Sequence, residues 1–308
     1  MRKPFAQNVE RLKLVGVASL ATLVYAGCAG PPPIHEVPLA RLKHEIARDI
    51  PGVSASDLII PHEISEESFL AIHSQVPELE DRSAGAYALL KLLYSGDHLG
   101  LEYRWGETRS AEATLAHGGG NCLSLAAVLV GAARRYSGAA RYIEIQDRPS
   151  RHAEGDLEVW ASHIAVILPS VDGPLIVDFR GAQGDLDSMR YKQIGDRTLV
   201  AHYYNDKGYD LLRIARERNE PPPWSEAGRF FETATRIDPS LGRAWNNLGV
   251  AQARLGDLRA AELSYQRANK SPGNYLKTAT EKNRVSLDFR RQTPGLEVSA
   301  WEKGEKPF

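Results

Sequence analysis

The pattern of apolar residues predicts a helix followed by three strands in the middle of the chain. Between Cys122 and Tyr136, apolar residues recur at intervals of three and one, as they do on the buried face of a helix. Three β-rich runs of strand length come next, RYIEI, VWASHIAVIL and LIVDF. Residues 122–180 are therefore expected to form one helix and three strands.

Helices are also predicted before this segment, over most of residues 38–110. The run SEESFLAIHSQV begins with Ser65, whose side chain can cap the first turn. An apolar helix is predicted over SAGAYALLKLLY, and a short one over TRSAEATLAH. For the short helix, Thr108 or Ser110 can be the N-terminal cap and Gly118 can end it.

From about Ala201 the pattern changes to pairs of helices that resemble tetratricopeptide repeats. One copy carries the residues of that pattern at their usual offsets: Trp245, Leu248, Gly249, Gly256, Ala261, Tyr265 and Ala268. An earlier copy, with an enlarged turn between its helices, is carried by Tyr204, Gly208, Ala227, Phe231, Ala234 and Pro239. Two repeats and a capping helix near residues 275–291 bury too little surface to be stable alone, so we expect them to pack on the preceding domain.

The N-terminus has the layout of an export signal. A basic start precedes an uncharged, mostly apolar run from Leu14 to Gly27, too short for a comfortable membrane span. The run ends in VYAGC, which resembles the lipobox of bacterial lipoproteins and so implies lipidation of Cys28. A plain signal peptide or an N-terminal anchor, with Cys28 incidental, is the alternative. A proline-rich stretch after Cys28 predicts an extended tether.

Composition and the lipobox resemblance narrow the expected location and partners. The chain has 308 residues and a formal net charge of −1, so no basic excess indicates nucleic-acid binding. The resemblance implies a lipid anchor to the bacterial membrane. We expect the protein in the cell envelope, at the outer membrane and facing the periplasm.

The position of Cys122 raises the question of a nucleophile. The chain has 2 cysteines, so lipidation of Cys28 leaves no second thiol with which Cys122 could form a disulfide. Oxidising compartments favour paired cysteines, and a solitary thiol exported there needs an explanation such as catalysis. The stretch GGGNCLSL also places three glycines directly before Asn121 and Cys122, which favours access to the thiol.

A histidine and an aspartate on the predicted strands are suited to act with this thiol. His163 lies 41 residues after Cys122, and Asp178 lies 15 residues after His163. A hairpin with Leu168 opposite Gly173 would place His163 directly opposite Asp178, with Cβ atoms about 5 Å apart. The pattern therefore predicts a carboxylate beside an imidazole on one face of the sheet.

These residue types can support thiol chemistry together. A carboxylate fixes the imidazole tautomer, and an imidazolium stabilises a nearby thiolate and exchanges protons with it. A helix N-terminus favours the thiolate further, and backbone N–H groups freed by glycine can bind an oxyanion. Taken singly, each residue also has a structural interpretation: a buried cysteine, a structural histidine, or an aspartate that caps a turn. The other histidines show no ligand spacing, so neither a metal nor another cofactor is expected.

Residues 85–200 resemble the transglutaminase-like superfamily, through TRSAEATLAHGGGNCLSLAAVLVGAARRY, SHIAVIL and LIVDF. The resemblance implies an α+β, papain-like cysteine hydrolase core: a catalytic helix and an antiparallel sheet. It implies Cys122 as nucleophile, His163 as general base and acid, and Asp178 as the group that orients His163. Asn121 and Trp160 are candidates for donors to an oxyanion.

The sequence thus predicts two domains and supports two functions. The predicted segments are a signal peptide (1–27), a tether and N-terminal helix (28–60), a transglutaminase-like domain (61–200), an all-α repeat domain with a capping helix (201–292) and a disordered tail (293–308). One function is cysteine-dependent hydrolysis of, or acyl transfer from, a peptide or protein amide, with the repeats recruiting a protein partner. The other is an inactive scaffold that binds proteins through its repeats.

Overall fold

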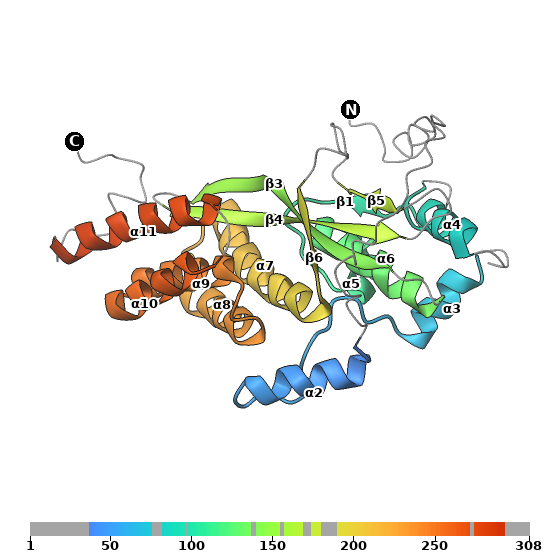
Figure 1. The fold of residues 1–308 in the computed structure, drawn as a ribbon, viewed down its shortest axis with the longest axis horizontal. Coiled ribbons are helices and arrows are strands. Elements are labelled where there is room, and N and C mark those ends of the chain that lie inside the picture. The colour runs from blue at the N-terminus through green and yellow to red at the C-terminus, as the bar shows by residue number, and fades with distance from the viewer. Residues whose placement is uncertain are drawn as a thin grey trace, which may run out of the picture.

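In the computed structural model, the described residues are 37–75, 82–95, 98–136, 140–154, 157–168, 174–179, 190–271 and 274–292. They form a mixed α+β fold in which helices surround a small antiparallel sheet and continue into a helical region (Figure 1). The predicted signal peptide, Cys28, the proline-rich stretch after it and the predicted disordered tail lie outside these residues. No helix among the described residues has both the length and the apolar character needed to cross a membrane.

The predicted central helix is present as α6 (Cys122–Arg135). Asn121 caps its first turn, and all residues from Cys122 to Ala133 are buried. One side of α6 packs against α4 (Arg82–Tyr94) and the sheet, in the main apolar core of the protein. An almost continuous run of small and branched apolar residues explains this burial, because no face of the helix needs contact with solvent.

The three predicted strands are part of a four-stranded antiparallel sheet with the order β5-β4-β3-β6. Its strands are β3 (Arg141–Glu154), β4 (Leu157–Leu168), β5 (Leu175–Val177) and β6 (Tyr191–Ile194). The register of β3 with β4 shifts between Ile145 and Ser150. Ile145 is the partner of His163, so the irregularity begins directly beside this residue.

The predicted register of the β4–β5 hairpin is wrong by two residues. Leu168 pairs with Leu175 instead of Gly173, so the connection is longer than predicted. The shift leaves His163 and Asp178 on the same face, because side chains alternate with a period of two along a strand. Asp178 follows directly after β5 and is not itself a paired strand residue.

The helices before α6 begin where their capping residues indicate. In α3 (Glu66–His73) the Ser65 side chain accepts from the Ser68 amide, and in α5 (Ala111–His117) the Ser110 side chain accepts from the Ala113 amide. Ser110, not Thr108, is therefore the cap of α5. After α5, β2 (Gly119–Gly120) pairs in parallel with β1 (Glu102–Tyr103).

The C-terminal part consists of helices that pack as consecutive pairs. They are α7 (Asp196–Glu217), α8 (Trp224–Ile237), α9 (Gly242–Arg254), α10 (Leu258–Asn269) and α11 (Asn274–Gln292). Small residues allow close approach within the pairs: a Cβ on Gly208 would lie 2.7 Å from the Phe231 ring, and one on Gly249 would lie 2.6 Å from the Tyr265 ring. Helix α7 crosses the predicted domain boundary between residues 200 and 201.

The helical region is joined to the rest of the protein by apolar and charged contacts. Helix α2 (Leu39–Asp49) packs with α7, α8 and the start of α9 in a separate apolar cluster. Strand β4 contacts α9 and α11, and Arg243 of α9 forms a buried ion pair with Glu144 of β3. Arg134, at the end of α6, donates to both carboxylate oxygens of Asp196 in α7, at 2.8 and 2.9 Å. The C-terminal helices therefore pack on the sheet and on α6.

Candidate active site

The glycines in front of α6 are required by close packing. Gly118 ends α5 in the left-handed conformation, with φ 71°. A Cβ on Gly119 would lie 2.4 Å from the Glu102 carbonyl oxygen, and one on Gly120 would lie 2.5 Å from Ser124 Cβ. From the sequence, we predicted that these glycines give access to the thiol. In the structure, they allow β2 to pack closely against β1 and against the first turn of α6.

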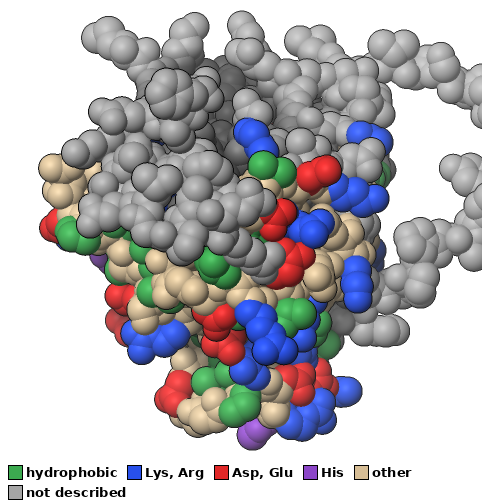
Figure 2. Space-filling view, turned by 90° about the vertical axis from the view of Figure 1, so that its left-hand side faces the viewer, with side chains coloured by type: hydrophobic (Ala, Val, Ile, Leu, Met, Phe, Trp, Pro, Cys, Tyr) green, Lys and Arg blue, Asp and Glu red, His purple; other side chains and the backbone are tan. Residues whose placement is uncertain are grey.

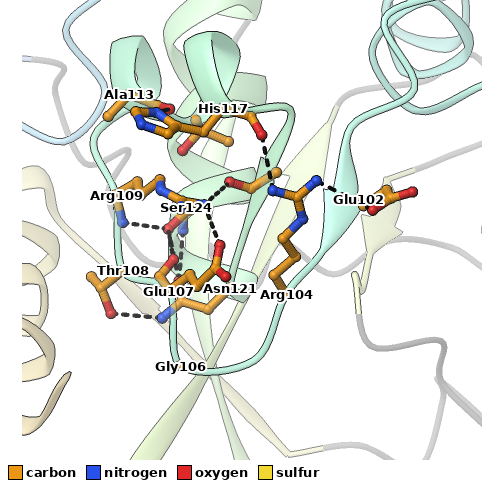
Figure 3. Close-up of polar contacts among 12 residues, drawn as sticks. Glu102, Arg104, Gly106, Glu107, Thr108, Arg109, Ala113, His117, Asn121 and Ser124 are labelled. Atoms are coloured by element: carbon orange, nitrogen blue, oxygen red, sulfur yellow. Dashed lines mark hydrogen bonds and ion pairs between the residues drawn. The ribbon is translucent and has the colours of Figure 1, made fainter. Parts of the chain in front are cut away.

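Asn121 and Ser124 hold the start of α6 to the 104–109 loop, which connects β1 to α5 (Figure 3). Asn121 Oδ1 accepts from the Ser124 amide at 3.0 Å, and the Asn121 amide donates to the Glu107 carbonyl at 3.0 Å. The Asn121 side-chain amide donates to Thr108 Oγ1 at 2.8 Å, and Ser124 Oγ accepts from the Arg109 amide at 2.8 Å. Asn121, a candidate oxyanion donor, thus has a structural task as the helix cap.

Cys122 is the first residue of α6 and is 4% exposed. Its helix has 14 residues, so the backbone N–H groups of the first turn give this position a positive partial charge. Helix α6 packs against β4, the strand that carries His163. The structure therefore places the thiol at the N-terminal end of α6, which favours negative charge, and α6 is the helix that packs against the strand of His163.

The structure brings His163 and Asp178 together. His163 Nε2 lies 2.6 Å from Asp178 Oδ1, and the two side chains are 0% and 5% exposed. A carboxylate can only accept, so in the neutral imidazole the shared proton lies on Nε2 and the lone pair on Nδ1. Nδ1 is buried, and no residue that the structure describes forms a hydrogen bond with it, so Cys122 and His163 are not hydrogen-bonded to each other.

For two predicted site residues, Trp160 and Cys28, the described part of the structure does not include the side chain. The backbone of Trp160 lies in β4, paired with Arg151, but its side chain is outside the described part of the structure. Cys28 lies outside the described residues altogether. Among the described residues, no group of three or more His, Cys, Asp or Glu side chains could hold a metal ion.

Helix α7 holds the other side of the 104–109 loop, a feature that sequence reasoning missed. The Thr108 amide donates to Asp210 Oδ2 at 2.8 Å, and Arg213 donates to the Gly106 carbonyl at 2.6 Å. Burial raises the pKa of Asp210 to about 6, against the lowering effects of the hydrogen bonds from Thr108 and of the charge on Arg213. No local pattern marks this contact, because its residues are about a hundred positions apart.

Further ionisable groups lie between α7, α9 and β3. Burial raises the pKa of Asp206 to about 7, and the charges of Asp210 and Glu144 act in the same direction, while Arg243 opposes them. Burial also lowers the pKa of His202 to about 4. Asp206 and Asp210 are therefore carboxyl groups that are difficult to ionise. For Glu144, by contrast, the effect of burial is outweighed by the charge and the hydrogen bond of Arg243 together with other nearby positive charges, so its pKa is lowered.

Comparison with protein-family models, with curated proteins and with solved structures gives no significant match to this chain. The fold and the site define it as a mixed α+β protein with a buried His–Asp pair on a sheet, a cysteine at the start of the adjacent helix, and a packed helical region at its C-terminus.

Proposed function

We propose that this protein is a cysteine-dependent amidase, peptidase or acyltransferase, in which Cys122 is the nucleophile of a transglutaminase-like core. The observation that carries the proposal is the 2.6 Å contact between His163 Nε2 and Asp178 Oδ1. The contact engages one ring nitrogen and leaves Nδ1 to exchange a proton with another group, which is the arrangement that a general base needs.

The position of Cys122 supports this proposal. A thiolate is favoured at a helix N-terminus, and α6 packs against the strand of His163. Among the described residues, none forms a hydrogen bond with His163 Nδ1, so the thiol and Nδ1 are not hydrogen-bonded. Catalytic hydrogen bonds are often long without substrate and shorten in the complex, so we expect the two groups to approach each other when substrate binds.

The chemistry follows from these roles. Nδ1 takes the thiol proton, the thiolate forms a C–S bond with the amide carbonyl carbon, and the carbonyl oxygen becomes an oxyanion. The oxyanion collapses, the C–N bond breaks, and the imidazolium gives its proton to the leaving amine. Water or a second amine then attacks the thioester, Nδ1 takes its proton, and the thiol leaves with that proton restored. Asp178 holds the imidazole and stabilises its protonated form.

The same proposal includes a lipid anchor and a partner. We infer that Cys28 is lipidated and holds the protein in the cell envelope, and that the helix pairs are tetratricopeptide-like repeats that recruit the peptide or protein substrate. The spacing of Gly208 against Phe231 and of Gly249 against Tyr265 supports the repeats, because each glycine lies where two paired helices approach closely.

One observation favours the scaffold function as a second candidate. An open cavity of about 490 Å³ lies on the helical region, away from Cys122, and is lined by Pro239, Ser240, Trp245, Arg267, Lys270 and Ser271. Arg267 stacks over the Trp245 ring at 4.5 Å from its centroid. Figure 2 shows acidic, basic and hydrophobic side chains interspersed over the described part of this helical end of the molecule. Such a site can bind a protein segment without any chemistry at Cys122.

Alkylation of the native protein separates the two functions. In a Cys28→Ser background, Cys122 is the single thiol, and its reaction with iodoacetamide can be followed by mass spectrometry. We expect labelling near neutral pH, and we expect His163→Ala to slow it about tenfold or more at pH 7, because a lost imidazolium raises the thiol pKa by about one unit or more. Asp178→Asn should have a smaller effect, since Asp178 acts through the imidazole.

The matched control is His44→Ala, which removes an exposed histidine of α2. It should leave the labelling rate unchanged. Labelling only after unfolding, or equal rates for the parent and His163→Ala, would contradict the catalytic proposal and favour the scaffold. A screen of cell-envelope peptides and proteins against the parent and Cys122→Ala would then define the substrate of an active enzyme.

A further inference from the structure

The 104–109 loop is enclosed between the start of α6 and the middle of α7. On one side it contacts Asn121 and Ser124, as Figure 3 shows. On the other side it contacts Asp210 and Arg213 of α7. Since Arg134 and Asp196 join the far end of α6 to the start of α7, both ends of the Cys122 helix are connected to the first helix of the C-terminal region.

A continuous row of hydrogen bonds crosses this loop. Asp210 Oδ2 accepts from the Thr108 amide at 2.8 Å, Thr108 Oγ1 accepts from the Asn121 side-chain amide at 2.8 Å, and Asn121 Oδ1 accepts from the Ser124 amide at 3.0 Å. Thr108, Asn121, Ser124 and Asp210 are 2%, 7%, 0% and 5% exposed. At this degree of burial, water does not readily replace a lost partner.

Asp210 holds Thr108 through its backbone. The Asp210 carboxylate accepts from the Thr108 amide at 2.8 Å, and this contact fixes the position from which Thr108 Oγ1 accepts from Asn121. The Ser124 amide can only donate, so it turns Asn121 Oδ1 toward itself and leaves the Asn121 NH₂ group to face Thr108. Removing the Asp210 carboxylate leaves the buried Thr108 amide without this acceptor and so loosens the partner of Asn121.

We propose that Asp210 is a positioning residue for Cys122, acting through Thr108 and Asn121, so that the reactivity of the thiol depends on the docking of α7. This inference rests on the proposed nucleophilic role of Cys122. Among the other contacts of α7 with the loop, Arg213 reaches the Gly106 carbonyl, and Lys207 reaches the Thr108 carbonyl only at 3.5 Å, so Asp210 makes the shorter contact with Thr108. The raised pKa of Asp210 agrees with a carboxylate held in a buried, functional contact.

Two variants and two controls test the inference in the Cys28→Ser background. Asp210→Ala and Thr108→Val each interrupt the row, whereas Thr108→Ser keeps the hydroxyl. Asp238→Ala is the matched control for Asp210, because Asp238 also accepts from a backbone amide (Ser240, 2.9 Å), at the α8–α9 turn. Hydrogen–deuterium exchange of residues 119–125 reports the cap, and the pH dependence of iodoacetamide labelling reports the thiol.

We expect both interrupting variants to speed exchange in residues 119–125 at least about fivefold and to move the labelling midpoint up by about half a pH unit, because the capped helix end stabilises the thiolate. The double variant should be no worse than either single one, and both controls should match the parent. Unchanged exchange in Asp210→Ala would overturn the inference.

Faster exchange without a moved midpoint would also overturn it, because Asp210 would then have a structural role alone. Failure of the parent to label in the native state would contradict the proposed nucleophile, and the positioning role with it. Exchange would still show whether Asp210 supports the cap of α6 through Thr108, so the two failures are distinguishable.

Discussion

Replacing Asp206 by asparagine is expected to stabilise the protein more at high pH than at low pH. Asp206 is half-buried on α7, and Asn205 donates to its Oδ1 at 3.1 Å. Burial raises its pKa from 3.8 to about 7. A carboxyl group whose pKa is raised on folding binds protons more tightly in the folded state, so the folded protein loses stability as the pH rises from about 4 through about 7.

The magnitude follows from the size of the pKa difference. Each pH unit corresponds to about 1.4 kcal/mol, so a difference of about three units sets a ceiling of roughly 4 kcal/mol on the cost of ionising Asp206. Solvent at a half-buried carboxylate reduces this cost, and we expect about 1–2 kcal/mol. Asparagine keeps an oxygen for the Asn205 amide and carries no charge, so it avoids the cost at every pH.

Urea unfolding of the parent and Asp206→Asn at pH 4.5, 6, 7 and 8 measures the effect. The variant's gain in the free energy of unfolding should be smallest at pH 4.5, rise with pH, and reach about 1–2 kcal/mol at pH 8. Glu281→Gln removes an exposed charge from α11 and should show no such pH-dependent difference. A gain that is the same at all four pH values, or a loss at pH 8, would refute the reasoning.

Two further predictions concern helix packing and the N-terminus. Gly249→Ala should lower the free energy of unfolding by about 1–3 kcal/mol in urea titrations, because the added Cβ would lie 2.6 Å from the Tyr265 ring. Gly228→Ala, where the nearest atom is 3.4 Å away, should be neutral or slightly stabilising, and equal losses in both would contradict the packing argument. Cys28→Ser should abolish incorporation of a labelled fatty acid and leave the chain unprocessed or soluble, whereas acylation and fractionation like the parent's would exclude the lipoprotein proposal.

Local patterns in the sequence predict the elements that carry the candidate site. The spacing of apolar residues gives α6 and its start at Cys122, and the caps Ser65 and Ser110 mark where α3 and α5 begin, because these features depend on neighbours within a few residues. The period of two along a strand also predicts that His163 and Asp178 share a face.

Other features depend on tertiary contacts and could not be read from the sequence. The β4–β5 register differs from the predicted one by two residues, because strand pairing is fixed by the packing of whole strands and by the length of their connection. The glycines before α6 meet Glu102 and Ser124, atoms that only the folded chain brings near them. The contact between Thr108 and Asp210 joins residues 102 positions apart, so no local pattern could reveal it.

The sequence by itself determined the order of the elements and the residue types at the candidate site, since both follow from short-range periodicity and side-chain chemistry. Only the tertiary structure decided which groups are buried against which others. It placed Asp178 on His163 Nε2, gave Asn121 the task of capping α6, and surrounded Asp206 and Asp210 with enough protein to raise their pKa values. The physical reason is that burial and charge–charge interactions act through space, between residues that the chain itself keeps far apart.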